Sequence, residues 1–134
     1  MNWDESGPMA ATPVGASEML AHYLFRKELR QEDNTVKTEA VMPFPHESLS
    51  ATRHQGLTDE EVWESGTVVA NKQGRTLMGR ADFKRLDLPK WLDALPEEPP
   101  RNHVEIVGWP SERSAQMAQA LLLAGACVGR RLPA

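Results

Sequence analysis

Residues 102–129, NHVEIVGWPSERSAQMAQALLLAGACVG, decide how this chain of 134 residues is expected to fold. From His103 to Trp109 the side chains alternate in character with a period of two, which is typical of a β-strand. Pro110 cannot donate to a β-ladder, so the strand is expected to stop at Trp109. The residues that follow have the pattern of a helix. The stretch therefore predicts a core strand, a sharp corner and the longest helix of the chain.

The helix is expected to start after Ser111, because its hydroxyl can accept a hydrogen bond from a free amide of the first turn. Gly129 is expected to end the helix in a left-handed conformation. Residues 120–128 are all apolar or small, which predicts a helix buried on more than one side. One apolar face recurs at helical spacing and comprises Ala115, Ala118, Leu121, Leu122 and Gly125.

The clearest helix start elsewhere in the chain is at Thr58. Thr58 and Glu61 form a capping box, while Leu57 and Val62 stand at the two positions of a hydrophobic staple. These residues predict a second helix that begins directly after Thr58.

The other segments are shorter and predict mainly strands. Residues 17–30 fit either a helix or a strand around residues 22–26, and we favour the strand. Residues 35–42, 49–54 and 75–83 alternate as half-buried strands do. Residues 86–95 have the pattern of a turn or two of helix.

Length and element order predict one small α+β domain. We expect a mostly antiparallel sheet of about four to five strands, with two main helices packed on it. Residues 1–15 are polar and rich in Gly and Pro, so they are expected to form a flexible arm before a domain over residues 16–134.

Composition indicates a globular protein without membrane association. Charged residues make up 25% of the chain and hydrophobic residues 40%, and no apolar stretch is long enough to span a bilayer. No signal-peptide pattern opens the sequence. The single cysteine, Cys127, cannot form a disulfide within the chain, so the cytoplasm is the expected compartment.

Polar residues on three predicted strands form a candidate catalytic set. His54 and His103 could serve as base and acid in phosphodiester cleavage, with Arg80 stabilising the negative charge that develops on phosphorus. Asp82 and Glu105 lie two residues beyond Arg80 and His103 and complete the set. The alternative is that these are ordinary ion pairs on half-exposed strands.

No metal or cofactor is expected. His103 and Glu105 match the H-x-E part of the zinc deaminase signature, but the P-C-x-x-C part is missing. Neither of the Gly-rich phosphate-binding motifs occurs. Cys127, inside an apolar helix, is expected to be a small core residue rather than a nucleophile.

Aromatic and basic residues supply the candidate binding residues. Trp3 in the arm and Trp109 at the corner are candidate interface anchors, although Trp109 could instead plug the end of the core. Trp63 and Trp91 are expected on core faces. The basic residues considered for binding are Arg53, Arg75, Lys84 and Arg85.

The leading hypothesis is a small cytoplasmic protein-interaction subunit or adaptor without catalytic activity of its own. Another protein subunit is the expected partner, and a homo-oligomer is a further option. The alternatives are a small nuclease or phosphodiesterase using His54, His103 and Arg80, and nucleic-acid binding through the basic segment 72–90. The net charge of −4 argues against a general nucleic-acid coat.

Overall fold

The computed structural model describes residues 12–30 and 32–133, and its framework is a six-stranded antiparallel sheet. The strand order across the sheet is β4-β5-β2-β1-β3-β6. The strands are β1 Met19–Leu24, β2 Leu49–Arg53, β3 Gly79–Lys84, β4 Asp93–Pro96, β5 His103–Val107 and β6 Val128–Arg131. The helices are α2 Asp59–Lys72 and α3 Arg113–Ala126, with short 3-10 turns η2 Thr38–Val41 and η3 Arg85–Asp87. The predicted α+β class is confirmed, with six strands in place of four to five.

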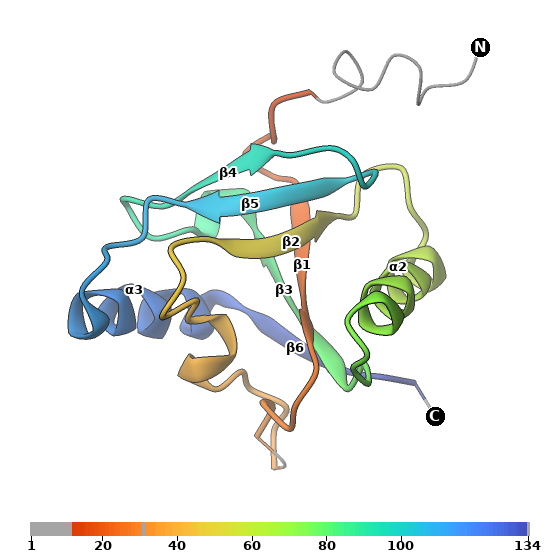
Figure 1. Ribbon diagram of the computed structural model, residues 1–134, viewed down its shortest axis with the longest axis horizontal. Coiled ribbons are helices and arrows are strands. Elements are labelled where there is room, and N and C mark those ends of the chain that lie inside the picture. The colour runs from red at the N-terminus through yellow and green to blue at the C-terminus, as the bar shows by residue number, and fades with distance from the viewer. Residues whose placement is uncertain (1–11, 31, 134) are drawn as a thin grey trace.

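Strand pairing divides the sheet into two halves that meet at a narrow junction. β1 pairs with β3 along its whole length, but with β2 only through Leu20↔Arg53 and Ala21↔Thr52. Beyond these two pairs β1 leaves β2. In Figure 1, β4, β5 and β2 lie across the page while β1 runs down it. The sheet is therefore bent where β1 and β2 separate.

The two helices cover opposite faces of the sheet, on either side of β1 (Figure 1). Leu20 of β1 belongs to the larger core cluster, together with Leu123 of α3. Tyr23 of β1 belongs to the smaller cluster, together with Val62 of α2. Alternate residues of β1 thus serve two cores, as the period of two along a strand requires.

Several predicted elements are confirmed. The capping box is present, because the Thr58 hydroxyl accepts from Glu61 N at 3.1 Å and Glu61 Oε1 accepts from Thr58 N at 2.9 Å. Strands β1 and β2 lie within 17–30 and 49–54, and β3 overlaps the predicted range 75–83 but extends one residue beyond it, to Lys84. The strand predicted from His103 is β5, although it ends at Val107 rather than at Trp109.

The strand predicted over residues 35–42 is wrong. Val36 makes only an isolated bridge to Leu29, and Thr38–Val41 form the 3-10 turn η2. The buried positions are Val36, Ala40 and Val41, which do not alternate. The alternating segment before Pro43 is too short to define a strand.

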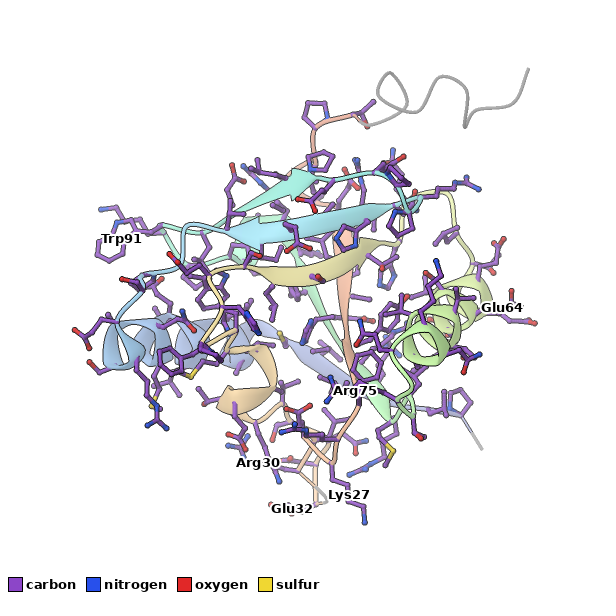
Figure 2. The ribbon with its side chains drawn as sticks, viewed as in Figure 1. Lys27, Arg30, Glu32, Glu64, Arg75 and Trp91 are labelled. Atoms are coloured by element: carbon purple, nitrogen blue, oxygen red, sulfur yellow. The ribbon has the colours of Figure 1, made fainter. Side chains whose placement is uncertain are left out.

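The short helix predicted within residues 86–95 is also wrong. The segment contains the end of η3 and the beginning of β4, and Ala94 pairs with Ile106 of β5. Trp91, expected on a core face, is 65% exposed and points away from the body of the molecule (Figure 2). Trp63 is half-buried and packs against the smaller core cluster, as predicted.

Both expected ends of the last helix need correction. The N-cap is Glu112 rather than Ser111, and its carboxylate accepts from Ser114 N at 3.1 Å. The helix ends at Ala126, and Gly129 lies in β6, where it does not have positive φ. Gly129 is instead a point of close approach, because a Cβ there would collide with the carbonyl oxygen of Asn34. Neither α2 nor α3 combines the length and hydropathy required to cross a bilayer.

Gly66 allows α2 to pack closely on β1, and its replacement tests that contact. A Cβ at Gly66 would lie 2.6 Å from Tyr23 Cε1 and 3.1 Å from Leu77 Cδ2. We predict that Gly66→Ala lowers the free energy of unfolding by about 1 kcal/mol, because overpacking costs about 1–3 kcal/mol and better helix propensity returns about 1 kcal/mol. Urea denaturation followed by circular dichroism measures the change.

Gly125→Ala is the matched control for this prediction. A Cβ at Gly125 on α3 meets nothing within 4 Å, so this variant should be as stable as the wild type or up to about 1 kcal/mol more stable. Equal effects of the two substitutions would contradict the close packing of α2 on Tyr23.

Candidate functional site

The candidate catalytic residues all lie on the α2 face of the sheet, but in two separate clusters. Strand pairing aligns His103 with Thr52, Thr52 with Ala21, and Ala21 with Asp82. His103 and Asp82 are therefore three strand spacings apart, about 14 Å along the sheet. His54 lies with Arg80 and Asp82, whereas His103 lies with Glu105. The predicted set of His54, His103 and Arg80 is not assembled at one point.

The first cluster centres on Arg80, which is 1% exposed. Its Nε lies 3.1 and 3.2 Å from the two carboxylate oxygens of Asp82, and its Nη2 donates to Asp59 at the start of α2. The guanidinium also lies over the ring of Trp63, 4.5 Å from the ring centroid. Arg80 therefore attaches the first turns of α2 to β3. The hydrogen bond from Arg80, with a smaller contribution from its charge, holds the pKa of Asp59 below the ordinary value.

Two further basic residues, Arg130 and His54, contact Asp82. It accepts a hydrogen bond from Arg130 Nε on β6 at 3.0 Å. His54 Nε2 lies 3.4 Å from Asp82 Oδ1, which is an ion-pair distance when His54 is protonated. Two arginines, Arg80 and Arg130, pair with the two carboxylates of Asp59 and Asp82. This Asp82 cluster is therefore a charge-balanced structural network, in which Arg80 is already engaged by carboxylates and is not presented to a phosphate.

The second cluster centres on Glu105 of β5. His103 Nε2 lies 2.6 Å from Glu105 Oε2, while the hydroxyls of Ser48 and Ser50 donate to the two carboxylate oxygens at 2.8 and 2.7 Å. Burial alone would raise the pKa of Glu105, but these three hydrogen bonds outweigh it and hold the pKa below 4.5. Glu105 is therefore ionised at neutral pH. Because an ionised carboxylate can only accept, His103 Nε2 is the donor in this hydrogen bond.

Glu97, directly after β4, adds a third potential metal ligand to this Glu105 cluster. The ligand atoms of Glu97, His103 and Glu105 all lie within 4.8 Å of one another. A divalent cation could be held by this set. The hydrogen bonds of Glu105 nevertheless complete the cluster without a metal, so the geometry does not demand one.

A cavity of about 300 Å³ lies between α2 and the place where β1 leaves β2. His103 is the only member of the candidate catalytic set on its wall. Tyr23 also lines it, and the Tyr23 hydroxyl donates to Val62 O on α2 at 2.6 Å. Sequence patterns did not reveal this cavity, because it depends on a divergence between two strands.

Arg53, a candidate binding residue, has a structural role. It is 3% exposed, and its Nε and Nη2 bond Glu18 at 2.8 and 2.6 Å, which lowers the pKa of Glu18. Its Nη1 donates to Thr12 O at 2.6 Å, and Val14 close by is part of the larger core. Residues 12–15, which the sequence placed in the flexible arm, thus contact the domain. Residues 1–11, including Trp3, lie outside the described residues.

The basic segment 72–90 does not form one continuous surface. Arg80 is buried, Arg75 lies 5.1 Å from the centroid of the Phe25 ring, and Arg85 pairs with Asp93 at 2.8 Å. Arg75 precedes β3 and Lys84 ends it, so these charges stand at opposite ends of the strand. Nucleic-acid binding through this segment therefore stays a hypothesis, with these four basic residues divided between the buried middle of β3 and the parts of the chain on either side of it.

Trp109 is not exposed at the corner. It is 5% exposed, and its Nε1 donates to Ile106 O at 3.0 Å. The interpretation of Trp109 as an exposed interface anchor is therefore wrong, and its alternative role as a plug at the end of the core is correct. The most exposed tryptophan of the described residues is Trp91.

The outer face of α3 is the largest departure from expectation. The buried positions of the helix are Gln116, Ala120, Leu123 and Ala124. The face expected to be buried lies largely outside, because Leu121 and Leu122 are each 62% exposed and Ala118 and Gly125 are exposed as well. Gln116 belongs inside because its Nε2 donates to His46 O at 3.1 Å and to Pro110 O at 2.9 Å. When nearly every position is apolar, periodicity cannot separate the inner face from the outer one.

No protein-family model, curated protein or solved structure matches this chain. Function must therefore be inferred from geometry alone.

Cys127 offers no reactive thiol, because burial, with smaller contributions from Asp82 and Asp87, raises its pKa to about 12.

The Asp82 cluster is tested by replacing its central carboxylate. We predict that Asp82→Asn lowers the free energy of unfolding by about 3 kcal/mol, because it removes a buried partner of Arg80 while Asp59 remains. Chemical denaturation measures the loss. Asp93→Asn is the matched control, since its pair with Arg85 is half-exposed and should contribute about 0–1 kcal/mol. Similar losses in both variants would contradict the assigned role of Asp82.

The Glu105 cluster makes a prediction about pH. Because the folded pKa of Glu105 is lowered, its ionised form contributes stability that is present above pH 4.5 and lost as pH falls through the lowered value. We predict that Ser48→Ala with Ser50→Ala raises the pKa of Glu105, since burial then acts against fewer hydrogen bonds. Carbon-detected NMR titration of the Glu105 carboxyl measures it. Ser65→Ala should leave that pKa unchanged, and an unchanged value in the double variant would refute the arrangement.

Proposed function

We propose that this chain is a protein-interaction subunit whose α3 outer face docks on an apolar surface of another protein. The α3 outer face comprises Met117, Ala118, Leu121, Leu122 and Gly125. The observation that carries the proposal is that every exposed position of α3 from Met117 to Gly125 holds an apolar residue. Contiguous apolar surface of this kind is typical of a docking site.

The other helix of the same chain provides an internal comparison. The exposed side of α2 carries several charges, including Asp59, Glu60, Glu64 and Lys72, and Figure 2 shows Glu64 pointing away from the sheet. A surface helix ordinarily has such a polar side. By contrast, α3 has no charged residue after Arg113. The composition of α3 suits a helix that is covered on both sides.

The exposed leucines provide a driving force for docking. Burying a leucine side chain completely is favourable by about 1.5–3 kcal/mol, so covering the exposed parts of Leu121 and Leu122 would contribute about 1–2 kcal/mol each. A hollow of about 260 Å³ adjoins the α3 outer face, lined in part by Leu121, Gly125 and Cys127. An aliphatic or aromatic side chain of the partner fits there as an anchor. The absence of charge on the face favours a partner surface that is itself apolar, such as one side of an amphipathic helix.

Site-specific cross-linking in intact cells tests the proposal. With p-benzoylphenylalanine in place of Leu121, irradiation should give one discrete product that joins this chain to another protein, identified by mass spectrometry. Val68 on α2 is 54% exposed and is the matched control position, from which no such product is expected.

A second substitution tests whether Leu122 also takes part in docking of the α3 outer face. Leu122→Glu, combined with the probe at position 121, should abolish the product because a charge would be buried in the interface. Absence of a product from position 121, or the same products from positions 121 and 68, would contradict the proposal.

A further inference from the structure

The cavity under α2 is a direct consequence of how the sheet bends. The β1–β2 ladder ends at Ala21↔Thr52, and His22 Nδ1 reaches Ser50 O at 2.8 Å where the strands have separated. The C-terminal half of α2 spans this opening and contributes Val68 and Val69 to the cavity wall. The volume of about 300 Å³ is in the range of small-molecule sites.

The wall of the cavity combines apolar surface with positive charge. Phe25, Val68 and Val69 contribute to its apolar part. Its basic residues are Lys72, Arg101, His22 and His103. Among the residues that the structure describes, no Asp or Glu lines the cavity, although the chain has 19 acidic residues against 15 basic ones. The carboxylate of Glu105 is next to His103, and it accepts hydrogen bonds from Ser48, Ser50 and His103.

The position of Lys72 makes it the main candidate for contact with a ligand. It is exposed at the last turn of α2 and forms no ion pair with any other described residue. Arg101 adds positive charge from the β4–β5 connection while keeping an interaction within the chain. Thr52 and Ser65 also line the cavity.

We propose that this cavity binds a small amphipathic organic anion, with its anionic group beside Lys72 and its apolar body against Val68, Val69 and Phe25. An apolar wall favours burial of a ring or short chain, and a cation in a partly enclosed site favours a sulfonate, carboxylate or phosphate. This binding site is distinct from the α3 outer face, which lies on the opposite side of the sheet.

Two dyes that share an aromatic body test the proposal on the full chain. The anion is 1-anilinonaphthalene-8-sulfonate, and N-phenyl-1-naphthylamine is the uncharged compound without the sulfonate. Fluorescence titration should show saturable one-to-one binding of the anion, with a dissociation constant at least ten-fold lower than that of the neutral dye. Equal affinities for the two dyes would overturn the proposal.

Variants and NMR establish where the anion binds. Lys72→Met should weaken binding of the anionic dye at least five-fold and leave the neutral dye unchanged, whereas Lys84→Met at the end of β3 should affect neither. Amide shifts on titration should cluster at Ser65, Val69 and His103. Shifts confined to Leu121 and Leu122 of α3, or equal effects of the two lysine variants, would refute the site.

Discussion

The narrow pairing between β1 and β2 is the constraint on which the rest of the structure depends. Two residue pairs join these strands, after which β1 follows β3 alone. The sheet consequently bends, and α2 and α3 fill the two sides of the bend (Figure 1). His22 lies where the strands separate. Burial lowers its pKa, so a neutral imidazole makes the hydrogen bond to the Ser50 carbonyl. The cavity under α2 is the space that this divergence leaves.

Charge is used on the α2 face to position a helix. Arg80 is wholly buried and contacts Asp82, Asp59 and the Trp63 ring. The contact with Asp82 lies within β3, while the other two connect β3 to α2. Residues of the kind that catalyse phosphodiester cleavage thus serve here to hold two elements in register. His103 differs, because it lines the cavity, while its hydrogen-bond partner Glu105 does not. Of the five candidate catalytic residues, His103 is the one that lines a space a ligand could enter.

Local signals in the sequence predicted well, and signals that depend on distant partners did not. The capping box of Thr58 and Glu61 involves neighbouring residues only, and it is present. β4 could not be recognised, because Asp93–Pro96 is a strand by virtue of pairing with β5. The face of α3 was misassigned because Gln116 is buried through bonds to His46 and Pro110, which no periodicity reveals. Whether His54 and His103 converge depends on the strand order, which local sequence patterns do not reveal. In the structure they lie in separate clusters.

The exposed apolar side of α3 is the central claim about function, and its state in cells tests that claim most directly. Met117 on α3 and Met78 before β3 are 43% and 36% exposed, so hydroxyl radicals should oxidise both at similar rates in the purified protein. In intact cells a docked partner should protect Met117 while Met78 continues to react. A fall in the Met117 to Met78 oxidation ratio inside cells is the predicted result, measured by mass spectrometry. An unchanged ratio would contradict the account.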